Sequence, residues 1–382
     1  MDEGCLHAAR TSGAKISQDR AGIAMKFGLF LLGERPPGVS DSEVYSNAIE
    51  QARVADELGY DEVWLAEHHF APYGTIADPL VLAAAIATVT SRIRIGTAVV
   101  IPSFHAPIQL AERIAMVDVL SGGRLDLGIG RGYQKREFEK FGIPMDESRA
   151  RMEEGVAILE GLLSNESFSM HGNFWDIEDV AIYPRPVQKK VPIFIAALRT
   201  IETIRWIIHR GYDALVGNPY LVDPQLGESL KLFGRARAEA GATTHATEVW
   251  ALINGFVHED EEFARNYPRR STELGWKYVQ QYGDPFTRGS APSREYQAYA
   301  DWFDSHDTVS YERMLSMEST LIGNPDTVIS RMSVMHQRDG WENFMLCLNR
   351  GGALERTEVI KALELMATAV IPEVRKIATR PM

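Results

Sequence analysis

From Lys26 onward, one unit recurs along the chain: a short apolar or β-branched run, a polar or glycine-rich turn, and then apolar residues at helical spacing. The runs predict eight strands, at 26–32, 61–67, 92–100, 124–130, 192–198, 213–219, 248–257 and 343–349. The predicted helices are 41–58, 79–90, 107–120, 148–163, 200–209, 224–240, 261–281, 325–337 and 355–376. Strands that alternate with helices in this way are typical of a parallel sheet.

Local signals at the helix ends support this reading. Asp78 and Asn324 are capping residues that each precede a proline, and Gly59 and Gly211 follow the last turns of two helices. No glycine-rich dinucleotide fingerprint follows the first strand, which disfavours an open doubly wound sheet. The sequence therefore predicts an α/β fold, a (β/α)8 TIM barrel.

Two insertions interrupt the repeating unit. Residues 169–190 alternate on both sides of a Gly-Asn pair and predict a hairpin ahead of strand five. Residues 267–320, between strands seven and eight, are long and aromatic; they are interpreted either as a lid over a binding site or as a helical surface decoration. Residues 1–24 are expected to be a disordered or accessory extension, with an alternative start at Met25, and residues 25–382 a single domain.

Charge and composition exclude several classes of partner. The chain has 40 Lys and Arg against 52 Asp and Glu, a net charge of −12, which disfavours nucleic acid and anionic membranes. No apolar run approaches the roughly 18 residues of a membrane-spanning helix. Cys5 and Cys347 have no metal-binding spacing, and no HExxH motif occurs, so we expect no metal and a reducing, cytoplasmic location.

The first candidate for chemistry is the group Glu67-His68-His69, directly after the second predicted strand. In a TIM barrel this position lies on the face that carries the active site. An imidazole there exchanges a proton near neutral pH. Because neighbouring strand residues point to opposite faces, only one of the two histidines is expected to face the barrel mouth, and the other to be structural or exposed.

The second candidate is an anion site assembled from three segments. GIGRGYQKREF (128–138) combines glycines with Arg131, and Arg149 opens the next helix. After strand five, Thr200 and Thr203 lie at a helix N-terminus, where hydroxyl and N–H groups bind anions. The alternative readings are a surface ion pair for Arg149 and simple capping for the threonines. Together the segments predict a phosphate cradle on the same barrel face as the histidines.

These motifs carry a resemblance to a known family. The chain resembles the bacterial luciferase-like flavin monooxygenases, most of all the luciferase alpha subunit, between Met25 and about Ile371. The similar segments are MKFGLFLL, YDEVWLAEHHF, IRIGTAVVIPSFHAPIQLAE, SGGRLDLGIGRGYQKREFEKFG and STLIGNPDTVISRM. The resemblance implies a (β/α)8 barrel that binds reduced FMN, reacts it with O₂ to a flavin hydroperoxide, and oxygenates a small hydrophobic organic substrate.

The resemblance also assigns roles to residues. His68 falls at the catalytic histidine, and Gly130 replaces a reactive cysteine. The implied cofactor-binding residues are Glu67, Ala98, Val99, Arg131, Tyr133, Arg149, Arg199, Thr200 and Thr203. Arg199 and Thr200 stand where luciferase has a glutamate and a serine, so the charge of the cradle has changed. Ala98-Val99 takes the place of a non-prolyl cis peptide beneath the flavin ring, and Tyr133 is expected to flank the ring.

Further expectations concern partners and alternatives. A separate flavin reductase is expected, because the chain has no NAD(P)H fingerprint. The resemblance implies a homodimer formed through helices 79–90 and 107–120; the alternative is that these helices pack on their own barrel. Two other functions stay open: a deazaflavin-dependent hydride-transfer oxidoreductase, and a non-catalytic flavin-binding protein. The fold alone does not identify the substrate.

Overall fold

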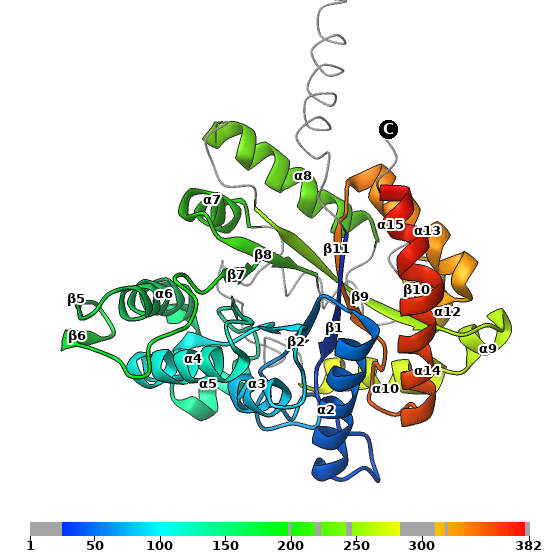
Figure 1. Cartoon of the computed structure of the whole chain (residues 1–382), viewed down its shortest axis with the longest axis horizontal. Helices are drawn as coiled ribbons and strands as arrows, with labels where there is room; N and C mark the ends of the chain where they lie inside the picture. Colours follow the sequence, from blue (N-terminus) through cyan, green and yellow to red (C-terminus); the bar gives the residue numbers. More distant parts are fainter. Residues whose placement is uncertain are drawn as a thin grey trace, which may run out of the picture.

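The computed structural model describes residues 25–197, 200–217, 223–241, 247–282, 310–317 and 320–378 (Figure 1). The expected N-terminal extension, Arg199 and much of the predicted lid lie outside these ranges. No helix in the described ranges is long and apolar enough to cross a membrane.

Eight parallel strands close into a barrel, which confirms the predicted fold. They are β1 (Lys26–Leu31), β2 (Glu62–Leu65), β3 (Arg94–Thr97), β4 (Leu125–Ile129), β7 (Ile193–Ala196), β8 (Asp213–Val216), β9 (Val249–Val257) and β11 (Asn343–Cys347). Each pairs in parallel with its neighbour, and the pairing of β11 with β1 closes the ring. The short strand β10 (Leu321–Gly323) pairs in parallel with the last residues of β9 and was not predicted, because three residues are too few to show an alternating pattern.

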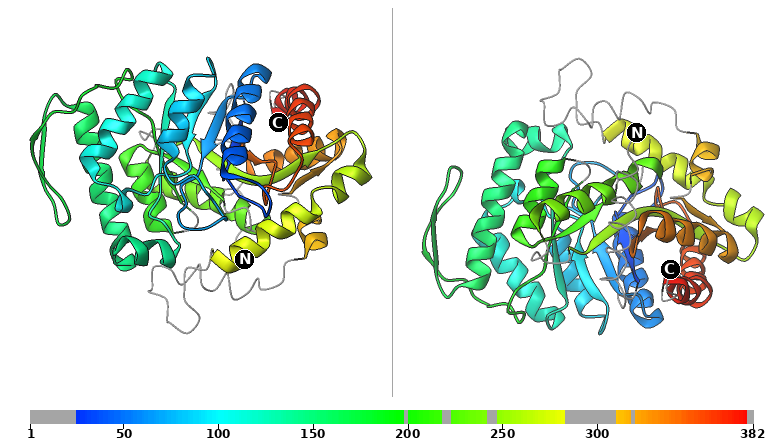
Figure 2. Two further views of the ribbon diagram at one scale, coloured as in Figure 1. Left: turned by 90° about the horizontal axis from the view of Figure 1, so that it is seen from below. Right: turned by 90° about the horizontal axis from the view of Figure 1, so that it is seen from above.

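Helices surround the strands (Figure 2). The main ones are α2 (Asp41–Leu58), α3 (Pro79–Ala87), α4 (Pro107–Ser121), α6 (Ser148–Ser164), α7 (Ile201–Arg210), α8 (Asp223–Ala240) and α13 (Pro325–Asp339). Shorter segments are η1 (Pro102–Phe104), α5 (Lys135–Phe141), η2 (Met145–Glu147) and α12 (Tyr311–Leu315). The predicted caps are confirmed: Asp78 and Asn324 accept backbone N–H groups of their helices, and Gly59 and Gly211 adopt left-handed φ angles of 84° and 68°.

One predicted helix is interrupted at a proline, so the prediction of a continuous helix over 261–281 is wrong, whereas 355–376 is helical as predicted and contains one π-helical turn. The segment 261–281 forms α9 (Glu261–Asn266) and α10 (Arg269–Tyr282), with Pro268 between them. The segment 355–376 forms α14 (Arg356–Leu365), the π-helical turn η4 (Met366–Val370) and α15 (Ile371–Ala378), with Pro372 after the turn. Pro268 has no N–H to donate to the preceding turn, so the regular hydrogen-bond ladder cannot run through it.

The predicted hairpin ahead of strand five is present. It consists of β5 (Phe168–His171) and β6 (Asp176–Val180), which pair antiparallel and project from the side of the barrel beside α6 (Figures 1 and 2). The buried carboxylate of Glu154 on α6 accepts the backbone N–H groups of Asn173, Phe174 and Trp175 at 2.8, 2.9 and 2.9 Å. The hairpin turn is thus fixed to α6.

Aromatic rings fill the middle of the barrel. Trp64 packs edge-on against Phe194 and Trp250, with ring centroids 5.2 and 5.4 Å apart. Gly96 makes this possible, since a Cβ at that position would lie 2.3 Å from the Trp64 ring. The packed centre leaves space for a ligand at the C-terminal ends of the strands.

A charged layer lies toward the N-terminal ends of the strands. Arg94 donates to both carboxylate oxygens of Asp126 at 2.5 Å, and Lys26 pairs with Glu248 at 2.6 Å. Burial raises the pKa of Glu62 well above its ordinary value, and the neighbouring Asp126 raises it further. Folded Glu62 therefore keeps its proton to a higher pH than it does in the unfolded chain.

The raised pKa of Glu62 makes the free energy of unfolding depend on pH, and Glu62→Gln should remove this dependence. Between the ordinary glutamate pKa and the raised folded pKa, only the unfolded chain releases the proton, so wild-type stability falls as pH rises. Each unit by which the pKa is raised is worth about 1.4 kcal/mol. We expect urea unfolding to show Glu62→Gln gaining stability over wild type between pH 5 and pH 8; an advantage independent of pH would contradict this account.

Candidate active site

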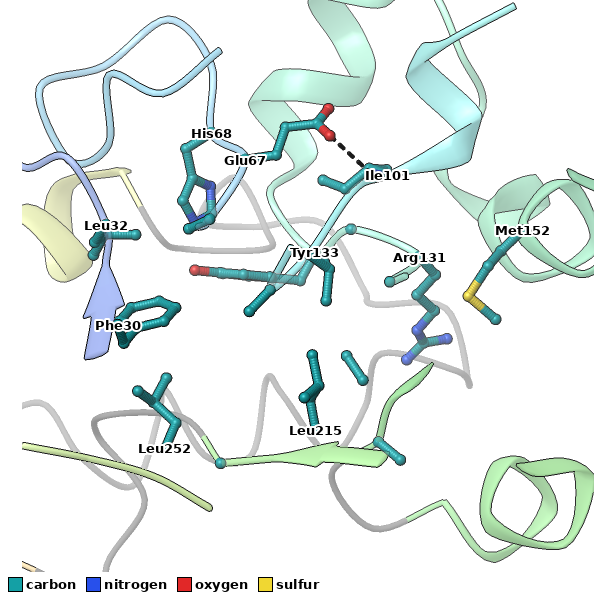
Figure 3. Close-up of a pocket in the computed structure, with 18 of the residues that line it drawn as sticks. Phe30, Leu32, Glu67, His68, Ile101, Arg131, Tyr133, Met152, Leu215 and Leu252 are labelled. Carbon is teal, nitrogen blue, oxygen red and sulfur yellow. Dashed lines mark hydrogen bonds between the residues drawn. The ribbon is translucent and has the colours of Figure 1, made fainter. Parts of the chain in front are cut away.

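One cavity opens at the C-terminal ends of the barrel strands, and its wall is lined by residues of the strands or of the loops that directly follow them (Figure 3). Every predicted site residue that the structure describes lines this cavity: Glu67, His68, Ala98, Val99, Arg131, Tyr133, Arg149, Thr200 and Thr203. Arg199 was also predicted, and it lies outside the described residues. Segments that are far apart in the sequence thus form one site on the face where TIM barrels carry their chemistry.

One end of the cavity holds cations and hydroxyl groups. Arg131 and Arg149 line it together with Thr200 and Thr203, and the Nη2 atom of Arg149 donates to Thr203 Oγ1 at 3.1 Å. Thr200 is the N-cap of α7, but its side chain makes no capping hydrogen bond. Arg149 also lies 3.6 Å from the half-exposed carboxylate of Glu153. Two guanidinium groups, two hydroxyls and a helix N-terminus form a donor set that fits a phosphate group.

The opposite end of the cavity is apolar. Phe30 and Leu32 from β1 and its following loop lie across the cavity from Arg131, and Leu252 from β9 lies near them (Figure 3). Met345 from β11 completes this part of the wall. A molecule with a phosphate at one end and a flat apolar body would match both ends.

The loop after β3 forms one wall of the cavity. The Ala98-Val99 peptide bond is cis, as the resemblance implies. Gly130 lies against this wall, and a Cβ at position 130 would come within 2.5 Å of Val99 Cγ2. A cysteine at position 130 would therefore force Val99 to move.

His68 and His69 turn to opposite sides, as expected for only one histidine facing the mouth. His68 lines the cavity, and its Nδ1 atom lies 3.3 Å from Glu137 Oε1 and 3.2 Å from Gln134 Nε2. His69 packs in the wall against the rings of Phe104 and Phe141. The proton-exchanging candidate is therefore His68.

Glu67 supports the wall behind the cavity. Its buried carboxylate accepts the N–H of Ile101 at 2.9 Å and the Nε2–H groups of His69 and His105 at 3.0 and 3.1 Å. Burial alone would raise the pKa of Glu67, but the hydrogen bonds from His105 and His69 outweigh burial and lower it. The carboxylate points toward Ile101 (Figure 3), so in this structure Glu67 supports the wall that it also lines, and its predicted contact with a cofactor stays a prediction.

Two tyrosine hydroxyls meet at the cavity. Tyr73 and Tyr133 both line it, and their hydroxyl oxygens lie 2.8 Å apart. Burial raises the pKa of both phenols, so both keep their protons at neutral pH. The Tyr73 ring also contacts the His68 ring edge-on, at a centroid distance of 4.7 Å.

Comparison with known proteins places the chain in a family. Residues 25–340 match the family of luciferase-like monooxygenases. The chain belongs to this family. The sequence prediction of a flavin-dependent monooxygenase is confirmed at this level.

Individual relatives span nearly the whole chain. The alkanal monooxygenase alpha chain of the Kryptophanaron alfredi symbiont is 32% identical over 92% of this chain and 99% of its own. The oxygenase component of flavin-dependent trigonelline monooxygenase from Acinetobacter baylyi is 27% identical over 91% of this chain and 95% of its own. Among solved structures, monooxygenase RslO1 from Streptomyces bottropensis superposes with a TM-score of 0.76 at 28% identity, covering 91% of this chain and 99% of its own.

The described part of the insertion after β9 packs against the mouth of this luciferase-like monooxygenase. Tyr278 and Val279 of α10 are buried in the apolar cluster at the mouth, and the Tyr278 hydroxyl donates to the carbonyl oxygen of Arg35 at 2.7 Å. The guanidinium of Arg136 lies 5.3 Å from the centre of the Tyr282 ring. The base of the predicted lid therefore lies at the active-site entrance, and residues 283–309 lie outside the described ranges.

Sequence reasoning missed three residues beside His68. Tyr73 lies in a loop, and Gln134 and Glu137 lie at the start of α5, a short helix that was not predicted. The available signal was the proximity of Gln134 and Glu137 to Arg131 in GYQKREF. Spacing alone did not show that α5 folds back against the loop that carries His68.

Proposed function

We propose that this luciferase-like monooxygenase binds reduced FMN and uses O₂ to oxygenate a small hydrophobic molecule. The observation that carries the proposal is the cavity itself, which joins phosphate-binding groups, an imidazole and an apolar end in one barrel mouth. Reduced flavin, when bound, would supply the two electrons that activate O₂. The protein would supply binding, orientation, proton transfer and a dry environment.

Each group of residues has a distinct task in this proposal. Arg131, Arg149, Thr200 and Thr203 would hold the phosphate, and Tyr133 and the Ala98-Val99 backbone would flank the ring. His68 would exchange a proton with the bound molecules. The apolar end would hold the substrate and exclude water, which would otherwise divert the reaction to hydrogen peroxide.

The named relatives support the finer parts of this proposal. One is an alkanal monooxygenase chain, and a limonene 1,2-monooxygenase from Rhodococcus erythropolis is 28% identical over 85% of this chain and 80% of its own; the names refer to an alkanal and to limonene. The trigonelline enzyme is named as an oxygenase component. We infer that a separate reductase delivers the reduced flavin to this chain. A free buried thiol, Cys347, fits a reducing compartment such as the cytoplasm.

Flavin titration tests the cofactor assignment. Anaerobic titration with reduced FMN, followed by absorbance, should show saturable binding. Arg149→Ala should weaken this binding roughly 10- to 100-fold, since it removes a charged donor to phosphate. Arg151→Ala is the matched control: Arg151 lies on the same helix, pairs with Glu147 at 2.7 Å, lies outside the cavity wall, and should leave affinity unchanged. Absence of binding to wild type would overturn the proposal.

The reaction class is tested by supplying O₂ and candidate substrates. Oxygenated product formed in step with flavin oxidation, from aldehydes, terpenes or aromatics, supports a monooxygenase. Reduction of a deazaflavin by an alcohol without O₂ would favour hydride transfer instead. Flavin binding that yields only peroxide with every substrate tested would favour the non-catalytic alternative.

We also infer a homodimer formed through α3 and α4. These adjacent helices expose Val81, Met116, Val119 and Leu120, whose exposed fractions are 66%, 50%, 42% and 53%. Exposed apolar side chains on two neighbouring helices support a protein–protein contact there. Met116→Lys should therefore halve the mass measured by light scattering, while Tyr183→Lys, at an exposed apolar position near the hairpin, should not. A wild-type monomer at micromolar concentration would exclude the dimer.

A further inference from the structure

We propose that Glu137 is a positioning residue that fixes the tautomer of His68, holding a proton on Nδ1 so that Nε2 is left to accept a proton in the cavity. The relevance to catalysis rests on the proposed function of His68. The tautomer itself does not, and it can be measured without flavin or substrate.

The contacts of one carboxylate oxygen carry the argument. Glu137 lies on α5, and its side chain is 1% exposed. Its Oε1 atom accepts the backbone N–H of His69 at 2.7 Å and lies 3.3 Å from His68 Nδ1. Since this oxygen already serves as an acceptor, the contact with Nδ1 is a hydrogen bond only if Nδ1 carries the proton.

A second neighbour opposes this arrangement. Gln134 Nε2 lies 3.2 Å from the same Nδ1 atom, and its Oε1 atom accepts from Arg136 Nη2 at 2.9 Å, which turns the amide NH₂ toward His68. An amide donor would favour a bare Nδ1 and place the proton on Nε2. A hydrogen bond to a carboxylate is roughly twice as strong as one between neutral groups, so we expect Glu137 to decide the tautomer.

Further hydrogen bonds hold α5 against the loop that carries His68 and so maintain the contact between Glu137 and His68. Arg136 donates to the carbonyl oxygens of His69 and Phe70 at 3.0 and 2.7 Å, which ties α5 to the segment that carries both histidines. Glu137 itself is outside the cavity wall. It therefore acts through His68 and would not touch a bound molecule.

The test uses full-length protein labelled with ¹⁵N-histidine, without flavin, at a pH where the imidazole is neutral. The chain has 10 histidines, and His68 is identified by the signals that disappear in His68→Gln. Its ¹⁵N shifts should show the proton on Nδ1. In Glu137→Gln the ratio should move toward the Nε2–H form by about tenfold, because a neutral acceptor replaces a charged one. This variant retains a carbonyl oxygen for the His69 N–H.

The control variant is Glu139→Gln, on the same helix, where the side chain is 60% exposed and pairs only loosely with Lys135 at 3.6 Å. It should leave the tautomer unchanged. Glu137→Asp should restore the Nδ1–H form at least in part. The proposal would be overturned if the His68 proton of wild type lies on Nε2, or if wild type and Glu137→Gln have the same tautomer ratio. The first of these outcomes can be measured on wild type even if the variant does not fold.

Activity provides the second measurement. With reduced FMN, O₂ and an accepted substrate, Glu137→Gln should lower the yield of oxygenated product per flavin oxidised about tenfold and alter its pH profile, with flavin affinity retained. If no substrate is ever oxygenated but the tautomer follows Glu137, the proposed function fails while the positioning role stands. If product forms normally in Glu137→Gln although the tautomer has changed, the positioning role has no catalytic consequence.

Discussion

His68→Ala is expected to lower the rate of oxygenated product formation by roughly 10²- to 10⁴-fold, the range by which a positioned proton-transfer group accelerates a reaction. His68 lines the cavity apart from Arg131, Arg149 and Thr203, the residues proposed to bind the phosphate. The affinity for reduced FMN should therefore change by less than a few fold. The two quantities are measured by product analysis under O₂ and by anaerobic flavin titration.

The control for this prediction is a histidine outside the site. His171 lies on the hairpin strand β5, where its side chain is 72% exposed, and His171→Ala should leave both product formation and flavin affinity unchanged. His69 is unsuitable as a control because its Nε2–H supports Glu67. Product formation by His68→Ala at the wild-type rate would exclude the proton-transfer role of His68, whatever the flavin affinity.

The barrel was predictable from the sequence because the spacing of apolar residues distinguishes strands from helices, and capping residues and glycines mark the helix ends. Gly59 and Gly211 end helices as expected, and the hairpin at 168–180 follows the predicted alternation. The helix break at Pro268 was missed, since apolar spacing continues on both sides of that proline. The continuing apolar period thus led to the prediction of an unbroken helix, although the proline in the sequence signalled a break.

The site was predictable only in part. His68 and Arg131 could be predicted as site residues because each follows a barrel strand, and the fold places the C-terminal ends of all strands on one face. The orientation of Glu67, by contrast, depends on His105, which is 38 residues away, and the contact of Glu137 with His68 spans 69 residues. Such contacts are set by tertiary packing, for which the chain has no local pattern.

A buried ion pair between the loops after β1 and β11 leads to the second large prediction. Glu34 Oε1 and Arg350 Nη1 lie 2.9 Å apart, and the two side chains are only 2% and 3% exposed. Glu34 also accepts the backbone N–H of Gly351 at 2.6 Å, and Ser271 of α10 donates to the Arg350 carbonyl oxygen at 2.6 Å. The pair therefore joins two loops of the barrel mouth to the helix at the base of the predicted lid.

Arg350→Met should lower the free energy of unfolding by about 3–5 kcal/mol, because it leaves the Glu34 carboxylate buried without its cation. Replacing both partners with apolar residues should cost less than the sum of the single changes, since no uncompensated charge remains. Arg356→Met is the matched control: its partner Glu50 lies 3.4 Å away, its side chain is 50% exposed, and its loss should cost no more than ~1 kcal/mol.

The pH dependence distinguishes lost charge pairing from lost packing. Burial raises the pKa of Glu34, and Arg350 opposes that rise. Without Arg350 the folded pKa rises further, so the unfolded chain releases the proton first as pH increases, and the variant loses stability above the ordinary glutamate pKa. Urea unfolding should therefore show a smaller loss for Arg350→Met at pH 4 than at pH 8. A loss of equal size at both values would mean that packing of the Arg350 side chain, and not its charge, stabilises the barrel mouth.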